Sequence, residues 1–163
     1  MPSNKTLAVF PGSFDPFTVG HEDIVLRALR LFDEIVVAVG SNSEKHSFFS
    51  VERRLEFIRE VFRDEPRVSA CSYSGLTVDF VREIGASHLL RGIRTAADFE
   101  FERAIAQVNR QMSGVDTAFL LTTPEHTPVN SSIVRDILSH GGDASMFLPE
   151  KIRSMVMNDK LHN

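Results

Sequence analysis

The stretch FPGSFDPFTVGH (residues 10–21) follows an apolar run at residues 7–10, which has the length and composition of a buried strand. Pro11, Gly12, Pro16 and Gly20 predict that the ten residues after this run form no regular structure. From His21 onward, apolar residues recur at the spacing of one helix face. The stretch therefore predicts a strand, a glycine-bearing turn and a helix. That arrangement aims backbone N–H groups and the positive end of a helix dipole at one point, which suits a phosphate.

Length and composition predict one domain over residues 1–163, because 42% apolar residues are enough for a single core. A net charge of −4 argues against a nucleic-acid surface, which is usually basic. The lone cysteine, Cys71, excludes an internal disulfide and is expected to be a packed thiol. The N-terminus resembles neither a signal peptide nor a membrane span. We expect a soluble, cytoplasmic protein.

Predicted strands and helices alternate along the chain. Strands are expected at residues 6–10, 34–39, 67–72, 88–91 and 116–121. Helices are expected at residues 21–32, 51–62, 77–84, 98–112 and 131–140, with a last helix at 149–157 that begins on a proline. This alternation predicts an α/β fold of the Rossmann-like kind, with a five-stranded, mostly parallel sheet and helices on both faces.

Two of the predicted helices carry the same apolar pattern. In residues 51–62 the stripe is Val51, Leu55, Ile58 and Phe62, and in residues 98–112 it is Phe101, Ile105, Val108 and Met112. Both stripes are expected to lie in the core. Ser50 is placed to cap the first of these helices, and Gly114 lies just beyond the second.

In a parallel sheet, ligands bind beyond the carboxyl ends of the strands, near the point where the strand order reverses. The segments that should carry chemistry are therefore residues 11–21, 40–50, 91–98 and 122–132. Each of these segments contains glycines, histidines, arginines or paired serines, which are unusual in a simple connection.

Two motifs resemble those of known enzymes. GSFDPFTVGH (residues 12–21) resembles the (T/H)-x-G-H signature of nucleotidyltransferases, and RGIRTAADFEFE (residues 91–102) resembles the second signature of the phosphopantetheine adenylyltransferase family. HSFFSVERR, NRQMSG, VNSSIVRD and FLPEKI also occur in the order and spacing of that family. The resemblance thus covers nearly the whole chain.

The resemblance implies a pantetheine-phosphate adenylyltransferase of coenzyme A biosynthesis. Such an enzyme transfers the adenylyl group of ATP to 4′-phosphopantetheine and releases dephospho-coenzyme A and pyrophosphate. The resemblance also implies a homohexamer built from two trimers, and it raises coenzyme A as a feedback ligand, which the sequence leaves open.

The residues themselves agree with this chemistry. An acceptor phosphate oxygen attacks the α-phosphorus in line, so the protein needs fixed donors and cations rather than a nucleophile. His21, at a helix start, can donate to a phosphate oxygen, although it could simply cap the helix. Ser13 is interpreted as a hydroxyl donor. Phe14 and Phe17 are expected in the core, with the backbone of Phe14 facing the nucleotide.

Arg91 and Arg94 are predicted to flank Gly92 in a loop after the fourth strand. Guanidinium groups bind phosphates through two parallel donors. As structural residues they would instead pair with Asp98 or Glu100.

The resemblance implies two sets of binding residues and a catalytic group. Acceptor binding is implied for Ser13, Lys45, Thr77 and Arg91. ATP binding is implied for Ser13, Phe14, His21, Gly92, Ile93, Arg94, Glu102, His126, Thr127, Val129, Asn130, Ser131 and Ser132. His21, Lys45 and Arg94 form the catalytic group.

Several positions keep a second interpretation. Thr77 could merely start a helix, and Glu102 could be a solvated helix residue. Asn130 stands where the family more often has serine, but asparagine caps a helix equally well. Arg135 could reach the pyrophosphate or the solvent, and His46 has no assigned role.

Magnesium is expected to arrive on the phosphates of ATP, as Mg²⁺ commonly does, and no metal site made only of protein ligands is predicted. Other functions stay open at this point. The first motif also serves adenylyltransferases for nicotinate mononucleotide and cytidylyltransferases for small alcohol phosphates, although RGIR and DFEFE argue against both. A nucleotide-sensing module that has lost turnover is a further alternative.

Overall fold

The computed structural model describes residues 4–41 and 46–159. Its sheet has five strands in the order β3-β2-β1-β4-β5, and every neighbouring pair is parallel. The strands are β1 (Leu7–Gly12), β2 (Glu34–Gly40), β3 (Val68–Tyr73), β4 (His88–Ile93) and β5 (Asp116–Leu121). The α/β, Rossmann-like prediction is confirmed, and the sheet is parallel throughout. The strand order reverses between β1 and β4, which is where such sheets bind their ligands.

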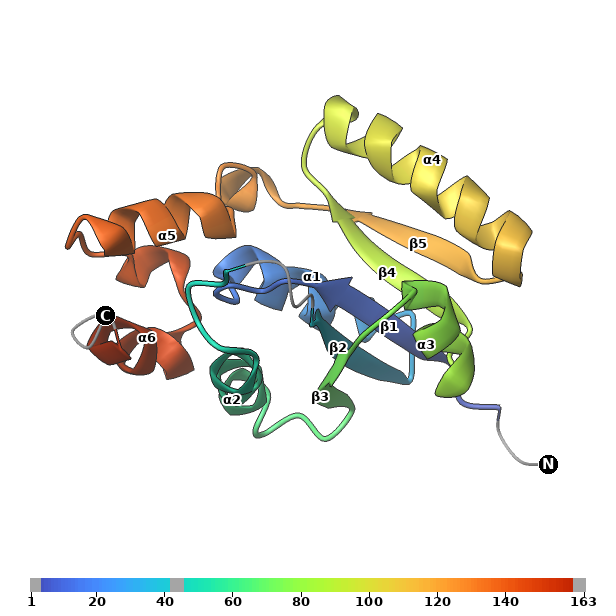
Figure 1. Cartoon of the computed structure of the whole chain (residues 1–163), viewed down its shortest axis with the longest axis horizontal. Coiled ribbons are helices and arrows are strands. Elements are labelled where there is room, and N and C mark those ends of the chain that lie inside the picture. Colours follow the sequence, from blue (N-terminus) through green and yellow to red (C-terminus); the bar gives the residue numbers. More distant parts are fainter. Residues whose placement is uncertain (1–3, 42–45, 160–163) are drawn as a thin grey trace.

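Helices cover both faces of this sheet (Figure 1). They are α1 (Val19–Ala28), α2 (Val51–Val61), α3 (Thr77–Glu83), α4 (Ala96–Ser113), α5 (Ser131–Ser139) and α6 (Arg153–Asp159). Three short 3₁₀ helices, Pro124–His126, Ser145–Phe147 and Glu150–Ile152, join the last elements. The expected helix start at Pro149 was wrong, since this proline precedes a 3₁₀ turn.

The core consists of two apolar clusters, one on each face of the sheet. Ala8 and Phe10 of β1 belong to the larger cluster, together with residues of α1, α2, α5 and α6. Val9 belongs to the smaller one, together with Val78 and Val81 of α3. Successive strand residues point to opposite faces, so a strand buried on both sides reads as an unbroken apolar run.

Strand β1 runs two residues further than the sequence predicts. Pro11 and Gly12 continue the ladder with β2, so the prediction that irregular structure starts at Pro11 was wrong. The carbonyl of Pro11 faces β4, where it accepts from Arg91. The N–H that proline lacks would point the same way, and β1 pairs with β4 only at Ala8 and Val9. The missing donor thus falls where the two strands separate.

Helix α1 starts at Val19, so Gly20 lies in the helix and not in the turn before it. The cause is a capping box at Thr18. The Thr18 hydroxyl accepts from the backbone N–H of His21, and the His21 side chain accepts from the backbone N–H of Thr18. Because both bonds satisfy N–H groups that the helix itself cannot, the helix extends past the glycine.

Helices α2 and α4 differ although their apolar patterns match. In α2, Leu55 and Ile58 are buried, and Ser50 caps the helix as predicted. No residue of α4 is buried, and Phe101, Val108 and Met112 are more than half exposed. The prediction that the α4 stripe lies in the core was wrong. The helix packs on β4 and β5 at the end of the sheet, where only one side of it meets other elements (Figure 1). Gly114 ends it in the left-handed conformation, as predicted.

Candidate active site

A cleft of about 1090 Å³ opens at the carboxyl ends of the strands, where β1 and β4 separate. It reaches from Asp15, Arg54 and Arg135 on one side to α3 and α4 on the other. Four of the residues assigned by sequence line it, namely Ser13, Thr77, Arg91 and Glu102. The cleft therefore gathers most of the predicted acceptor side of the site.

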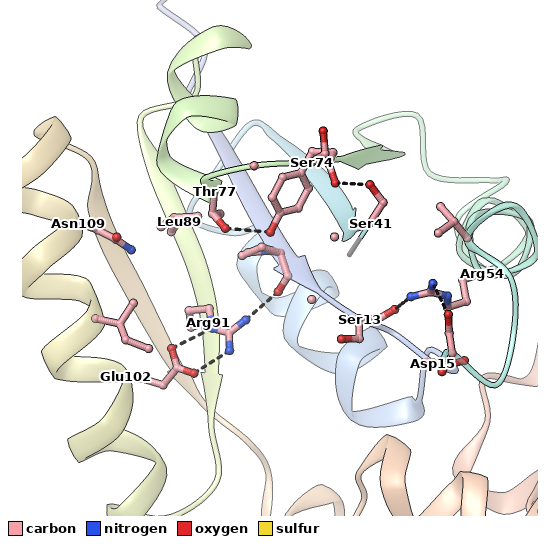
Figure 2. A pocket seen from close by; sticks show the side chains of 18 of the residues that line it. Ser13, Asp15, Ser41, Arg54, Ser74, Thr77, Leu89, Arg91, Glu102 and Asn109 are labelled. Carbon is pink, nitrogen blue, oxygen red and sulfur yellow. Dashed lines mark hydrogen bonds and ion pairs between the residues drawn. The ribbon is translucent and has the colours of Figure 1, made fainter. Parts of the chain in front are cut away.

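Arg91 is held by three hydrogen bonds (Figure 2). Its Nε and Nη2 donate to the Glu102 carboxylate at 3.0 and 2.6 Å, and its Nη1 donates to the Pro11 carbonyl at 2.7 Å. Arg91 and Gly92 belong to β4, so the prediction that they lie in a loop was wrong. The strand holds the backbone of Arg91, and the bonds to Glu102 hold its guanidinium. Together they fix a forked cation at the edge of the cleft.

Thr77 is the first residue of α3, and its hydroxyl lies 2.9 Å from the hydroxyl of Tyr73. Figure 2 shows Thr77 at the start of α3, above Arg91 and Glu102. Asn109 of α4 and Thr117 of β5 also line the cleft. The hydroxyl of Thr117 is a buried polar atom without a hydrogen-bond partner among the described residues.

His21 lies among the buried rings of Phe10, Phe14 and Phe17, with ring centroids 5.0 to 6.1 Å from its own. Its Nδ1 accepts the Thr18 backbone N–H at 3.0 Å, so the ring proton resides on Nε2. Burial, with the nearby charges of Arg91 and Arg94, lowers the pKa of His21 to about 3. Capping and donation are therefore compatible, because the cap uses one nitrogen and leaves the other as a neutral donor.

Phe14 lies deep in the same group of rings and adopts a φ of 48°. A Cβ on Gly12 would come within 2.9 Å of the Phe14 ring, so only glycine fits beneath it. Phe14 and Phe17 are core residues, as predicted. The side chains of Phe14 and Phe17 thus anchor the turn between β1 and α1 in the core.

Arg94 is exposed at the end of β4, where its Nε lies 3.2 Å from the Asp98 carboxylate. This is the ion pair that the structural interpretation of the sequence named. Ile93 is buried in the strand, and Gly92 leaves room for Ile24 of α1. Of these three residues, Arg94 alone carries a side chain suited to a phosphate.

The start of α5 meets the turn after β1. Asn130 caps α5 by accepting from the backbone N–H of Ile133 at 2.9 Å, as the sequence predicts for a capping residue. Ser131 donates its hydroxyl to the Pro16 carbonyl. Arg135 donates to the Asp15 carbonyl at 2.8 Å and to the Ser132 hydroxyl at 3.1 Å. Arg135 therefore neither extends into solvent nor stands free, since these bonds hold α5 against the turn.

His126, Thr127 and Val129 form the connection between β5 and α5. The ring of His126 bonds the Thr123 hydroxyl, and Val129 is buried. Thr127 donates to the carbonyl of Thr123. His126 approaches the start of α1, where its Nδ1 lies 3.9 Å from the Asp23 carboxylate. All three residues are separate from the residues that line the large cleft.

Sequence reasoning also missed several cleft residues. His46 lines the cleft, as do Arg54, Tyr73 and Asn109. Arg54 follows an arginine in an ordinary helix pattern, so no local signal separates it from a surface residue. Lys45, assigned to catalysis and to acceptor binding, lies outside the described residues.

Three further findings concern metal ligands, membrane-spanning helices and the free cysteine. In residues 4–41 and 46–159 no three His, Cys, Asp or Glu side chains form a group that could hold a metal ion. The same residues include no helix long and apolar enough to span a bilayer. Cys71 is partly buried, which raises the pKa of its thiol and keeps it protonated.

Comparison with known proteins defines first the class and then the family. Residues 9–137 match the model of the cytidylyltransferase-like family, so the fold is that of a nucleotidyltransferase. The phosphopantetheine adenylyltransferase of Flavobacterium psychrophilum is 54% identical over 146 residues, which are 90% of this chain and 97% of that protein. Those of Bacteroides fragilis and Porphyromonas gingivalis are 48% and 51% identical over 88% and 90% of this chain, and 95% of each relative is covered. The chain belongs to the phosphopantetheine adenylyltransferase family.

Solved structures of lower identity share the fold. A putative nicotinate-nucleotide adenylyltransferase from Vibrio parahaemolyticus gives a TM-score of 0.73 at 17% identity, covering 97% of this chain and 95% of that one. A bifunctional NMN adenylyltransferase/ADP ribose pyrophosphatase from Francisella tularensis gives 0.70 at 16% identity, covering 88% of this chain and 45% of that one.

Proposed function

We propose that this protein transfers the adenylyl group of ATP to 4′-phosphopantetheine, giving dephospho-coenzyme A and pyrophosphate. The observation that carries the proposal is the cleft at the strand-order reversal, which brings Ser13, Thr77 and Arg91 together, with the partly buried His21 close enough to Arg91 to feel its charge. The family supplies the substrates, since relatives about half identical over most of their length bear this activity in their names.

The reaction needs no protein nucleophile. A phosphate oxygen of the acceptor attacks the α-phosphorus of ATP, the new P–O bond forms, and the bond to the β-phosphate oxygen breaks, so that pyrophosphate leaves. Charge shifts among oxygens that are already anionic, and the protein assists by holding both polyanions and by donating to the developing charge. The acceptor lies beside Ser13, Thr77 and Arg91 in the cleft, and ATP extends from Glu102 toward α1 and α5.

His21 and Arg94 act on the ATP side. His21 donates from Nε2, which no described residue holds in a hydrogen bond, to an α-phosphate oxygen in the transition state. Its low pKa keeps it neutral, so this donation does not depend on protonation near neutral pH. Arg94 leaves Asp98 to bind the outer phosphates. Ser131 and Ser132 lie at the N-terminus of α5, where a helix dipole favours anions.

Arg91, Ser13 and Thr77 serve the acceptor. Arg91 binds the acceptor phosphate with donors that its three hydrogen bonds leave free, because a guanidinium carries five N–H groups. Glu102 faces the ribose of ATP, and its pairing with Arg91 places the two substrates next to each other. Lys45 is proposed as a second cation for the acceptor phosphate.

Magnesium is proposed to enter on the phosphates of ATP, where it neutralises charge on the leaving pyrophosphate.

We propose that the reaction takes place in the cytoplasm, in agreement with the free thiol of Cys71. Coenzyme A carries the same pantetheine arm as the acceptor and is proposed to compete for the cleft. Residues 1–163 are proposed to act as a single nucleotidyltransferase domain.

Pyrophosphate release with ATP tests the function directly. The assay uses phosphopantetheine, nicotinate mononucleotide and glycerol phosphate as separate acceptors. Pyrophosphate release with phosphopantetheine as the acceptor, and with neither of the other two acceptors, supports the proposal. Release with nicotinate mononucleotide or glycerol phosphate in its place would assign a different acceptor, and ATP binding without release with any of them would indicate a nucleotide-sensing module.

We also propose that the protein assembles as a homohexamer. The support is α4, which exposes Phe101, Val108 and Met112 at 68%, 53% and 59%. Phe101 also lines the cleft, whereas Val108 and Met112 do not. Phe99 of the same helix and Leu121 of β5 are exposed as well. An apolar patch that follows a whole helix indicates an association surface, and an amphipathic helix of one copy can pack against that of another.

Sedimentation tests this assembly. The wild type should sediment as a hexamer at micromolar concentration, whereas a variant with Val108→Glu and Met112→Glu should form smaller species. Leu31→Glu is the matched control, since Leu31 is 60% exposed but lies outside α4. A wild-type monomer, or a hexamer that survives both glutamates, would contradict the proposed interface.

A further inference from the structure

Arg54 of α2 is a buried arginine, with only 4% of its surface exposed, and the mechanism above does not use it. All of its hydrogen bonds among the described residues go to uncharged acceptors. Nη1 donates to the Ser13 carbonyl at 2.7 Å, Nη2 to the Ser47 hydroxyl at 3.2 Å, and Nε to the carbonyls of Phe49 and Ser50 at 3.1 and 3.3 Å. One guanidinium thus bridges the turn after β1 and the segment before α2.

Asp15 makes the reciprocal connection from the turn to that segment. It is 5% exposed, and its two carboxylate oxygens accept from the backbone N–H groups of Phe48 and Phe49 at 2.7 and 2.9 Å. Arg135 of α5 donates to the carbonyl of the same residue. The turn is therefore tied to two other elements through one carboxylate and two arginines.

The two connections have opposite charge, which explains how both can be buried. Burying a charge costs free energy unless it is hydrogen-bonded and compensated nearby. Burial lowers the pKa of Arg54, and the neighbouring charge of Asp15 acts in the opposite direction. A surface salt bridge would have been a cheaper way to keep α2 in place, so the cost of this arrangement indicates a demand for exact geometry at the turn.

The residue held by this network is Ser13. Its side chain is exposed at the edge of the cleft, while its carbonyl is the acceptor for Arg54 (Figure 2). The bond to the carbonyl fixes the peptide plane after Ser13 and with it the backbone position from which the Ser13 side chain starts, so the hydroxyl can reach only a limited part of the cleft. Arg54 also lines the cleft itself, so the clamp lies directly behind the surface that meets the acceptor.

We propose that Arg54 is a positioning residue, which together with Asp15 clamps the turn after β1 onto residues 47–50 and so holds the Ser13 side chain toward the acceptor phosphate. This inference rests on the proposed function. Arg54 acts through Ser13 and does not itself bind the phosphate. A displacement of about 1 Å at such a group can cost on the order of 100-fold in rate.

The neighbouring residue provides a matched control. Arg53 lies on the same helix, but it pairs with Asp159 and Glu56 and stacks over Phe57, away from the cleft. Arg53→Lys and Arg54→Lys make the same chemical change in adjacent positions. Lysine keeps the charge but cannot reach the acceptors on both segments at once, because it lacks the planar fork.

The experiment measures pyrophosphate release for wild type, Arg53→Lys, Arg54→Lys, Ser13→Ala and the Ser13→Ala/Arg54→Lys double variant, at a temperature where each is folded by circular dichroism. Arg54→Lys should lower kcat by about 10-fold or more, while Arg53→Lys should stay within about 2-fold of wild type. If Arg54 acts through Ser13, the double variant should lose little more than Ser13→Ala alone.

Two outcomes would overturn the inference. One is a folded Arg54→Lys variant with wild-type kcat, and the other is a double variant whose losses multiply, which would mean that Arg54 acts independently of Ser13. If Arg54→Lys does not fold, Asp15→Asn replaces it, because an amide can accept only one of the two N–H groups and should show the same coupling to Ser13→Ala. A wild type inactive with phosphopantetheine would contradict the proposed function instead.

Discussion

His21 and Arg91 flank the same strand ends but follow opposite physical strategies. His21 is neutral, partly buried against aromatic rings and held by a backbone N–H. Arg91 is charged, lies at the edge of the open cleft and is already paired with Glu102. A neutral donor gains from burial, since nothing needs to rearrange when charge develops in front of it. A cation for an incoming phosphate needs access and a partner that holds it in place until the ligand arrives.

The largest effect on turnover is expected from a substitution of His21. His21→Ala should lower kcat for pyrophosphate release by about 100-fold or more with a smaller change in KM, because a donor aimed at developing charge acts mainly in the transition state. Steady-state kinetics at saturating ATP and phosphopantetheine measure this. Near-normal turnover would mean that His21 only caps the helix, and the contrast between His21 as a neutral donor and Arg91 as a cation would then fail.

The next effect concerns the arginines and separates the two ligands. Arg91→Ala should weaken phosphopantetheine binding by roughly 1.5–3 kcal/mol and spare ATP, whereas Arg94→Ala should do the reverse. Arg91→Lys should restore binding only in part, since it loses the fork that spans Glu102 and Pro11. Calorimetry of the binary complexes measures each loss.

Arg103→Ala is the control for this pair of variants. Arg103 pairs with Glu100 on the exposed side of α4 and should leave both affinities unchanged. Equal losses of both ligands in the Arg91 and Arg94 variants would mean that the arginines act as one pool of charge. Unchanged binding in both would leave them as structural ion-pair partners.

A smaller effect is expected from the cap of α1. Thr18→Val keeps the volume of this 1% exposed residue but removes the hydroxyl that accepts from the His21 N–H, so the free energy of unfolding should fall by about 1 kcal/mol. Turnover should fall less than in His21→Ala, because the backbone N–H of Thr18 still holds Nδ1. Urea unfolding checks the stability, and an equal loss of kcat in the two variants would show that the hydroxyl itself orients the ring.

The pH dependence gives the smallest effect near neutrality. The pKa of His21 is about 3 in the folded protein and 6.5 as the reference, so the unfolded chain takes up this proton first as the pH falls. The contribution of His21 to stability is therefore complete above pH 6.5 and is lost progressively between about 6.5 and 3. His21→Gln should lack this loss, and urea unfolding of both proteins across that range tests it. An inflection of wild-type kcat near pH 6.5 that His21→Gln abolishes would contradict a neutral His21.

The paired helices show where sequence patterns are sufficient and where they fail. Residues 51–62 and 98–112 have the same apolar spacing, which correctly predicts two amphipathic helices. Periodicity gives the direction of an apolar face but not the partner that covers it. In α2 the partner is the sheet of the same chain, whereas the α4 face lies outside the core.

The site shows the same division. Motifs in the sequence led to Ser13, Thr77, Arg91 and Glu102, which the fold brings to one cleft. They gave no signal for Arg54, because its partners lie on residues 13 and 47–50 and a helix pattern does not show which arginine turns inward. The end of β1 was misjudged for a related reason, since proline and glycine are tolerated there by pairing with β2 on one side only.

The sequence by itself determined the alternation of strands and helices, the parallel sheet and the loops that carry chemistry, because local periodicity and turn residues act over a few neighbours in the chain. It also carried the family motifs. Only the tertiary structure decided that Arg91 is held by Glu102, that the His21 ring is neutral, that Arg54 bonds the turn after β1 and that the α4 stripe is exposed. Each of these depends on which distant residues meet and on how much water remains between them, and those contacts are set by packing across the whole fold.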